Sequence, residues 1–474
     1  MKKAASVAVL ALLLLCLLAA APPNIAPVKF TDTRLPNGLR VIIAEDHYAP
    51  VFSIAVTYNV GARDERPGRT GFAHLFEHMM FKGSERVGPG EHFFLIYNNG
   101  GNMNGSTSPD RTNYYETLPK NQLDLGLFLE SDRMRSLAIT KENLDNQRNA
   151  VQEERRLGVD NVAYGQTAEK MLELAYENFA YKHSTIGSMA DLNAATVEDV
   201  KAFFKTYYAP NNAVLTLAGD LNTADALARV KKYFGDIPRQ APPPPVDMTE
   251  PPQTAEKRAM LEDKLARLTR MDIAYKIPPG NTADSRALSM LGGILGGGGG
   301  FGGRFASGQR QRRGGGGPGG VGNSSRLYQK LVRGKEAVVS IFAGAGETRG
   351  PGLFRITAVV RPGKTPQEVE ALIYEEVEKV RNEAVTDEEL QRARSGVRRR
   401  QVQTRESSLG LAMQLGIDAV YFDDPGRINT ETEKRLAVTA ADMRRVAQKY
   451  LAPANRIVIH TLPAGGGAAK KAAD

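Results

Sequence analysis

Cysteine and tryptophan are nearly absent from this chain of 474 residues, which has one cysteine and no tryptophan. The cysteine, Cys16, lies in an apolar run near the N-terminus, so removal of that run leaves a mature chain without cysteine. Such a chain has no disulfide framework and no thiolate to bind a metal or attack a substrate. These absences exclude a disulfide-stabilised scaffold and cysteine-based catalysis.

The chain also lacks the pattern of aromatic residues interleaved with basic ones that single-strand nucleic-acid binders use. Its net charge of +9 is spread over many Lys and Arg, which we expect to solvate the surface. The arginine-rich segment 392–400 lies in a helical pattern and is expected to be such a solvated face. We therefore predict no nucleic-acid partner.

An apolar run from Ala4 to Ala21 follows Met1-Lys2-Lys3 and is closed by Pro22-Pro23. A charged start, a short apolar stretch and small residues at its end are typical of an export signal. The run is borderline in length for a membrane span, so we expect cleavage and no stable span afterwards. Leu15-Cys16 is a weak lipoprotein signal, and a lipid anchor is not favoured. The sequence predicts a periplasmic or secreted protein.

A repeat divides the rest of the chain into two homologous halves. Residues 196–215 match residues 439–458 at a constant offset of 243, with Thr, Asp, Tyr, Ala, Pro and Asn in common. In each copy a helical pattern ends at Ala-Pro and a β-branched strand follows. A proline-rich stretch between the halves is extended and semi-rigid, which suits a linker.

A second low-complexity segment, residues 292–322, contains 17 glycines and four arginines. It cannot bury enough apolar surface to fold alone and is predicted to be a mobile loop. The organisation we predict is a signal peptide over 1–21 (ending at about 26), an N-terminal domain over 28–236, a linker over 237–254, a C-terminal domain over 255–463 with the 292–322 insertion, and a disordered tail over 464–474.

Two of the six histidines lie four residues apart, with a carboxylate between them, in His74-x-x-Glu77-His78. The apolar residues around them recur at helical spacing and predict a helix that begins near Thr70, with that threonine as its cap. On a helix, both imidazoles project from one face about a turn apart and can bind a single ion. H-x-x-E-H is the inverted order of the zincin motif.

A zinc peptidase site needs three protein ligands and an open position for water. His74 and His78 supply two ligands, and Glu77 projects near the ion without having to bind it. That position suits a general base that takes a proton from the water and passes it to the leaving amine. The acidic segment 147–156 offers Glu153 or Glu154 as the third ligand, and their helical directions differ by about 100°, which does not choose between them.

Further motifs accompany this one. They are Leu35-Pro-Asn-Gly-Leu-Arg-Val, Gly71-x-x-His74-x-x-Glu77-His78-Met-x-Phe-x-Gly83, Gly101-Asn-Met-Asn104-Gly-Ser-Thr107, Thr112-x-Tyr114, Ala150-Val151-x-x-Glu154, Tyr208-Ala-Pro-Asn-Asn and Ser325-Arg-Leu-Tyr328. With them the sequence resembles the pitrilysin-type inverzincins, in particular the bacterial relatives of the mitochondrial processing peptidase. The resemblance spans residues 28–463, nearly the whole mature chain.

The resemblance implies an α+β fold of two homologous α/β-sandwich halves that enclose a peptide-binding chamber. It implies a zinc endopeptidase acting on peptides or unfolded protein segments, with one Zn²⁺ per chain and Glu154 as the third ligand. It also implies that Asn104, Gly105, Ser106 and Thr107 belong to an edge strand to which substrate adds as a further strand. Without the resemblance, that segment reads as a Gly/Asn-rich loop.

Two departures from the family pattern affect the site. Gln147 stands where the family often has a glutamate near the metal, and an amide cannot accept a proton, so we expect an effect on rate or affinity rather than loss of zinc. Val332 and Val339 stand where active single-chain members carry an arginine and a tyrosine that hold substrate carbonyls. Arg333 is one position off, which on a strand reverses the face. We therefore expect a homologous partner subunit, as a heterodimer, or else a homodimer.

Two other classes of protein compete with this interpretation. One is a non-catalytic structural homologue of the processing-peptidase fold; such proteins usually lose the metal motif, which this chain retains. The other is a basic nucleic-acid or membrane-surface protein built around the Gly/Arg segment. An export signal disfavours nucleic acid, and four arginines in a loop give only weak, salt-sensitive attraction.

Overall fold

The computed structural model describes residues 25–297 and 324–464 of the chain. The first half forms a six-stranded sheet in the order β1-β2-β6-β3-β5-β4. Its strands are β1 (Thr31–Arg34), β2 (Arg40–Glu45), β3 (Val51–Tyr58), β4 (Asn102–Thr107), β5 (Thr112–Pro119) and β6 (Ala213–Gly219). The second half forms a five-stranded sheet in the order β7-β11-β8-β10-β9. Its strands are β7 (Lys257–Asp263), β8 (Arg270–Ile277), β9 (Val338–Ala345), β10 (Gly352–Val360) and β11 (Arg456–Pro463).

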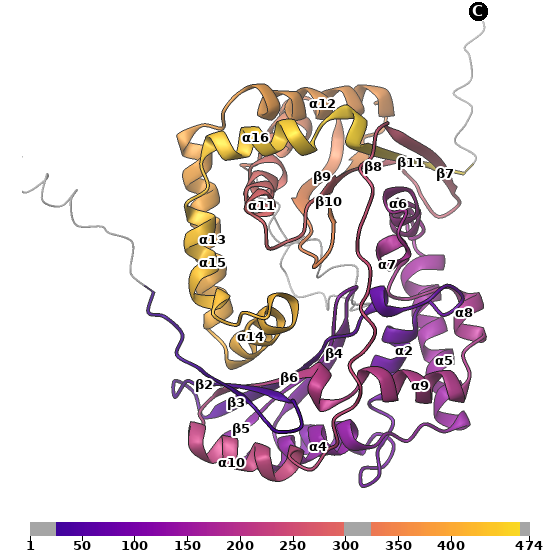
Figure 1. Ribbon diagram of the computed structural model, residues 1–474. Coiled ribbons are helices and arrows are strands. Elements are labelled where there is room, and N and C mark those ends of the chain that lie inside the picture. Colours follow the sequence, from indigo (N-terminus) through magenta and orange to yellow (C-terminus); the bar gives the residue numbers. More distant parts are fainter. Residues whose placement is uncertain (1–24, 298–323, 465–474) are drawn as a thin grey trace, which may run out of the picture.

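Helices cover both sheets (Figure 1). In the first half they are α2 (Phe72–Met79), α3 (Glu91–Asn98), α4 (Leu123–Arg135), α5 (Lys141–Arg155), α6 (Thr167–Ala175), α7 (Phe179–Lys182), α8 (Met189–Asn193), α9 (Val197–Tyr207) and α10 (Thr223–Phe234). In the second half they are α11 (Ala283–Gly296), α12 (Pro366–Asn382), α13 (Asp387–Arg405), α14 (Ser408–Phe422), α15 (Arg427–Leu436) and α16 (Ala440–Tyr450). Two π-helical segments are η3 (Arg156–Asp160) and η6 (Tyr328–Gly334), and short 3₁₀ turns are η1 (Ala62–Asp64), η2 (Lys120–Gln122), η4 (Pro210–Asn212) and η7 (Pro453–Asn455).

The sequence repeat forms the same helix–turn–strand unit in both halves. Helices α9 and α16 each begin at a capping box in which Thr and Asp bond reciprocally, Thr196 with Asp199 and Thr439 with Asp442. The strands that follow, β6 and β11, each pair in parallel with one neighbour and antiparallel with the other. The predicted fold of two homologous α/β-sandwich halves is confirmed.

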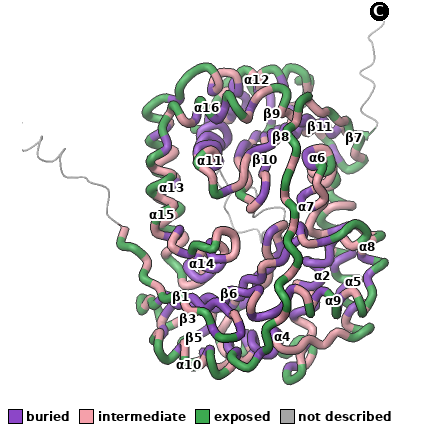
Figure 2. Tube along the Cα trace, viewed as in Figure 1, coloured by how far each residue is buried: buried purple, intermediate pink, exposed green. Residues whose placement is uncertain are grey.

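Each half contributes a helix that packs on the sheet of the other half. Helix α14 of the second half packs on β2, β3 and β6 of the first sheet, in a cluster that includes Leu415 and Ile42. Helix α6 of the first half packs on β8 and β11, in a cluster that includes Met171 and Ile457. Buried residues therefore run along the strands of both sheets (Figure 2). The two halves share apolar contacts, which stabilise their arrangement around the space between them.

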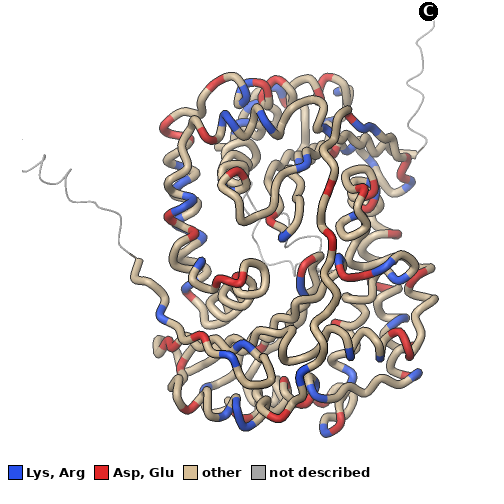
Figure 3. The backbone as a smooth tube through the Cα atoms, viewed as in Figure 1, with Lys and Arg blue, Asp and Glu red and all other residues tan. Residues whose placement is uncertain are grey.

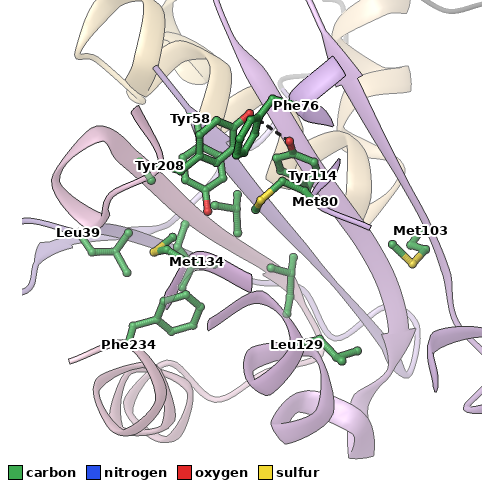
Figure 4. Packing of buried hydrophobic residues seen from close by; sticks show 14 of the residues in the cluster. Leu39, Tyr58, Phe76, Met80, Met103, Tyr114, Leu129, Met134, Tyr208 and Phe234 are labelled. Carbon is green, nitrogen blue, oxygen red and sulfur yellow. Dashed lines mark hydrogen bonds between the residues drawn. The ribbon is translucent and has the colours of Figure 1, made fainter. Parts of the chain in front are cut away.

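An aromatic cluster fixes α2 on the first sheet. The centre of the Phe76 ring lies 4.2 Å from the centre of the Tyr208 ring. The centre of the Tyr58 ring lies 4.4 Å from that of the same tyrosine. The hydroxyls of Tyr208 and Tyr114 are 3.1 Å apart (Figure 4). Because the apolar side of α2 is held here, the side that bears its histidines is directed away from this cluster.

Helix α2 starts differently from the prediction. Its cap is Gly71, in the left-handed region at φ 84°, and not Thr70. Thr70 instead donates its hydroxyl hydrogen to Asp191. The carboxylate of Glu65 accepts the backbone N–H groups of Gly71 at 2.9 Å and Ala73 at 2.8 Å. A buried carboxylate from the preceding loop thus satisfies the start of the helix, where negative charge is favoured.

The predicted loop at 292–322 begins too early. Residues 292–296 are the last turn of α11, and Gly297 ends the helix at φ 89°. A Cβ on Gly296 would lie 2.0 Å from the backbone nitrogen of Ala343, and one on Gly292 would lie 2.9 Å from Gly344. These glycines allow α11 to approach β9 closely, which is a packing role and not a flexible one. The rest of the segment, 298–322, lies outside the described residues.

The predicted linker, 237–254, has no regular structure but is held against its surroundings. Glu250 accepts the backbone N–H groups of Glu177 and Asn178, and it pairs with Lys276 at 2.7 Å. The predicted signal peptide and residues 465–474 of the tail lie outside the described residues. No helix in the described ranges is long and apolar enough to cross a membrane.

Candidate metal centre and active site

His74, His78 and Glu154 meet between α2 and α5. Oε2 of Glu154 lies 3.6 Å from Nε2 of His74 and 3.4 Å from Nε2 of His78. One ligand atom from each residue lies within 4.8 Å of the others. Tetrahedral ligands about 2.0–2.1 Å from a zinc ion are themselves about 3.3–3.5 Å apart. The two nitrogens and one carboxylate oxygen therefore fit zinc in type and spacing.

The structure also distinguishes between Glu153 and Glu154, the two candidates that the sequence offers for the third ligand. Glu154 is half-buried and turned towards the histidines, whereas Glu153 is exposed and pairs with Arg156 at 3.1 Å. Val151, three positions before Glu154, is fully buried and holds that side of α5 against the first core. The packing of α5 on α2 thus selects Glu154.

Burial acts on the protonation of the site. It lowers the pKa of the His74 imidazole, and the neighbouring His78 lowers it further, while Glu154 opposes both effects. A neutral imidazole is the form that binds a metal. Nδ1 of His74 is buried and has no hydrogen-bond partner among the described residues.

Glu77 lies on the same helix, beside strand β4. Its Oε2 accepts a hydrogen bond of 2.6 Å from the hydroxyl of Thr107, which fixes the carboxylate in position. Burial raises the pKa of Glu77, although the bond from Thr107 opposes the rise. A carboxylate with a raised pKa is the stronger base. Gly105 leaves room for it, because a Cβ there would lie 2.9 Å from Oε1 of Glu77.

The segment 104–107 is a strand and not a loop. It forms most of β4, which pairs with β5 on one side and lies at the edge of the sheet. Asn104, Gly105 and Ser106 are partly exposed, while Thr107 is buried against Glu77. The strand therefore has an unpaired edge in the described structure, beside the candidate base.

Gln147 is buried on α5, and its amide donates to Oδ1 of Asn146. This hydrogen bond links Gln147 to Asn146 and not to His74, His78 or Glu154. Its expected influence on the metal remains a prediction.

The positions aligned with the family's arginine and tyrosine do not reach the space between the halves. Val332 is half-buried against the second core, in η6, and Val339 is 51% exposed on β9. Arg333 also belongs to η6, where its guanidinium lies 5.8 Å from the ring of Tyr328. The expectation of a strand at Arg333 is wrong, because the backbone there is π-helical. None of the three lines the cavity described next.

A cavity of about 1000 Å³ separates the two halves. His74 and Glu154 lie on one wall, and residues of α13, α14 and α15 form the opposite wall. This volume is at the upper end of the range for ligand pockets, about 300–1,000 Å³. The predicted chamber between the halves is therefore present, and the candidate metal centre opens into it.

Sequence reasoning missed Glu65, which supports the start of α2, and His183, which lines the chamber. Nδ1 of His183 lies 3.5 Å from Oε2 of Glu65. Both residues lie in loops with no periodic pattern, so only the acidic character of residue 65 could have hinted at a helix cap.

The comparisons relate this two-domain α/β fold to the zinc metalloproteases. The chain matches the family description "Insulinase (Peptidase family M16)" over residues 40–188 and "Peptidase M16 inactive domain" over residues 194–397. The chain belongs to the M16 peptidase family, as the sequence motifs predicted.

Relatives and solved structures agree with this assignment. The chain is 28% identical to zinc protease PqqE of Helicobacter pylori over 426 residues, which are 89% of this chain and 90% of that one. It is 26% identical to the probable mitochondrial-processing peptidase subunit beta of Arabidopsis thaliana, covering 88% of this chain and 76% of that one. The crystal structure of a protease from Helicobacter pylori superimposes with a TM-score of 0.83 at 27% identity, covering 92% of this chain and all of that one. The comparisons support a peptidase that uses zinc.

Proposed function

We propose that this chain is a zinc-dependent endopeptidase that hydrolyses peptides or unfolded protein segments. The observation that carries the proposal is the meeting of His74, His78 and Glu154, of which His74 and Glu154 line the chamber, with Glu77 on the same helix as the histidines. One zinc ion per chain would be held by the two imidazoles and the Glu154 carboxylate. The names of the zinc-protease relatives support the choice of metal.

The residues around the metal divide the chemistry between them. When bound, zinc supplies Lewis acidity, which lowers the pKa of water and polarises a peptide carbonyl. Glu77 accepts a proton from the attacking water on its carboxylate and delivers it to the nitrogen of the leaving amine. Thr107 keeps that carboxylate oriented through its hydroxyl bond. The backbone of Asn104, Gly105, Ser106 and Thr107 would pair with an extended substrate, which needs no particular side chains.

The compartment and the partner belong to the same proposal. The N-terminal pattern of residues 1–21 supports export to the periplasm or the medium. Val332 and Val339, where an arginine and a tyrosine are expected, support a homologous partner subunit that contributes those groups. The likeness to a processing-peptidase beta subunit is consistent with such a pairing.

The alternative is a non-catalytic homologue of the same fold. It is favoured by the description of residues 194–397 as an inactive M16 domain. That description applies to the second half of the chain, however, and the first half retains His74, Glu77, His78 and Glu154 in one cluster. The catalytic proposal therefore rests on the first half alone.

The test measures zinc content and peptide cleavage in the wild type, Glu77→Gln and His78→Ala. Glu77→Gln should retain zinc and lose cleavage by about 10²–10⁴-fold, because the amide cannot accept a proton. His78→Ala should lose the metal itself. Undiminished cleavage by Glu77→Gln would overturn the role of Glu77, and zinc-loaded wild type that cleaves no peptide, with or without a partner, would favour the non-catalytic alternative.

A further inference from the structure

The arginine-rich segment predicted to be a solvated face is divided by the structure. On α13, one row at helical spacing lines the chamber: Val397, Arg400, Gln401 and Thr404. Other arginines of the helix are held elsewhere, Arg392 by Glu388 and Arg394 by the carbonyl of Val438. The basic residues of α13 are all arginines and recur along the helix (Figure 3). Only Arg400 and Arg405 of this helix bring a charge to the chamber wall.

The carboxylates on the chamber wall already have cationic partners. The acidic lining residues other than the metal-centre Glu154 are paired as follows: Asp110 with Arg63, Glu169 with Arg155, Glu347 with Arg427 and Arg435, Asp418 with Arg427, and Glu431 with Arg286 and Arg435. No lining carboxylate is therefore left over to neutralise a further arginine.

Arg400 is the lining arginine without a partner. It makes no hydrogen bond and no ion pair with any described residue, and it is exposed to the chamber that it lines. Outside the described ranges, Asp474 is the one acidic residue in the sequence. Desolvation by the chamber walls, together with repulsion from Arg435 and Arg399, lowers the pKa of Arg400. Its cation thus lies beside Arg435 and Arg399, with no carboxylate of the described residues bound to it.

Two other lining arginines are bound only to neutral groups. Arg405 donates to the carbonyls of Ala26 and Ile428, and Arg111 donates to Ser106 and Asn113. The hydrogen bonds of Arg405 therefore leave its positive charge on the α13 wall without a carboxylate partner among the described residues. An anion that enters the chamber meets a planar guanidinium with free N–H groups, which matches the geometry of a carboxylate.

We propose that Arg400 is a specificity-determining residue that binds a carboxylate of the substrate, either an Asp or Glu side chain or the C-terminal carboxylate of the peptide. This inference rests on the proposed peptidase function, since it takes the chamber to hold a peptide. The inference adds a preference for acidic substrates, which Arg400 would bind at the wall opposite the candidate metal centre. Gln401 and Thr404 stand beside Arg400 in the same row and offer polar groups to the adjoining peptide backbone.

The test uses short, otherwise neutral fluorescent peptides with one Glu placed at successive positions, each matched to a peptide with Gln. A second arm compares free and amidated C-termini, which separates the two sources of the carboxylate. Binding is measured on zinc-loaded Glu77→Gln, so that the peptides are not cleaved during the measurement. Cleavage is measured separately on protein in which Glu77 is unchanged. We expect about tenfold tighter binding for one charged form, weakened by salt.

In Arg400→Gln the ratio of affinities for the charged and the neutral peptide should fall to about one. Arg400→Lys should keep part of the preference, because the charge remains but the two-pronged contact is lost. Arg399→Gln is the matched control: it removes the same charge from the next position on α13, does not line the chamber, and should keep the full preference.

The inference is overturned if the protein with Arg400 intact binds charged and neutral peptides equally. It is also overturned if Arg399→Gln loses as much of the preference for charged peptides as Arg400→Gln does. Cleavage of all peptides without such a preference would leave the peptidase proposal intact. Conversely, carboxylate-dependent binding with no cleavage by the wild type, with or without a partner subunit, would support the Arg400 site and count against the peptidase.

Discussion

Four buried side chains of the first half form a polar cluster: His92 on α3, Glu116 on β5, and Glu130 and Arg133 on α4. Nε of Arg133 donates to Oε2 of Glu130 at 3.0 Å, and its guanidinium carbon lies 4.5 Å from the centre of the Tyr114 ring. Nε2 of His92 lies 3.6 Å from Oε2 of Glu116, without a hydrogen bond. Burial raises the pKa of Glu116 and lowers that of His92. Burial thus favours the protonated form of the Glu116 carboxyl and the neutral form of the His92 imidazole.

This protonation makes stability depend on pH. Because the pKa of Glu116 is higher in the folded chain than in the unfolded one, the folded state keeps a proton that the unfolded state releases. The free energy of unfolding should fall as the pH rises from about 4.5 towards the raised pKa. Glu116→Gln removes the ionisation, so its loss of stability between about pH 5 and pH 8 should be smaller than that of the wild type.

Urea unfolding over that pH range measures the effect. Glu383→Gln is the control, since Glu383 is exposed and its substitution should leave the pH dependence unchanged. Parallel pH profiles of the wild type and Glu116→Gln would contradict the assigned protonation. His92 acts in the opposite direction, because its lowered pKa adds stability as the pH rises towards about 6.5.

At the residue scale, the sequence predicted what depends on local spacing. His74, Glu77 and His78 lie within five positions, so the helical period alone brings them together. The choice of Glu154 over Glu153 depends on how α5 packs against α2, which is a long-range contact. No local pattern encodes that contact, and only the family resemblance pointed to Glu154.

At the scale of elements, the contact between β4 and α2 positions the candidate base. Gly105→Ala would place a methyl group 2.9 Å from Oε1 and 3.0 Å from Cγ of Glu77, so the carboxylate must move. We expect zinc to stay bound and cleavage to fall by at least about tenfold, because a small displacement of a catalytic group is costly. Zinc analysis and kcat on the same preparation check this expectation.

Gly293→Ala provides the control for that substitution, since an added Cβ on α11 meets nothing within 4 Å. It should leave cleavage unchanged and stabilise the helix slightly. Unaltered cleavage in Gly105→Ala would show that Glu77 does not need its present position.

The glycines of α11 and the segment around Arg333 show where prediction of elements failed. A run rich in glycine indicates flexibility when it is judged by composition, but Gly292 and Gly296 serve the close approach of α11 to β9. Arg333 follows a pattern compatible with a strand, yet the chain there forms η6. Helix α11 packs against β9, which lies well beyond it in the chain, and η6 packs against the same strand, which follows it directly.

At the scale of the whole molecule, the halves are joined by more than the linker. Besides α14 and α6, a polar group crosses between them: Asp110 accepts the hydroxyl of Tyr181 at 2.6 Å and the backbone N–H of Arg349 at 3.0 Å. Gly350 donates to the same tyrosine hydroxyl at 2.8 Å. The repeat predicted two halves, but the exchange of helices between them required the structure.

The incomplete substrate-holding groups lead to a prediction about assembly. The chain alone should cleave unfolded peptides slowly, and a homologous chain that carries an arginine and a tyrosine in its second half should raise kcat/KM by about tenfold or more. The measurement compares cleavage by the chain alone, the partner alone and the two mixed. A full rate by the chain alone, unchanged on mixing, would contradict the two-subunit account.

The central claim is that zinc is held by His74, His78 and Glu154, and Glu153 offers a neighbouring control for it. Zinc per chain, measured by atomic emission after dialysis, tests the claim most directly in Glu154→Gln and Glu153→Gln. The account predicts one zinc per chain for the wild type and Glu153→Gln, and loss of zinc with the fold intact for Glu154→Gln. Full zinc retention by Glu154→Gln, or loss of zinc in Glu153→Gln instead, would contradict it.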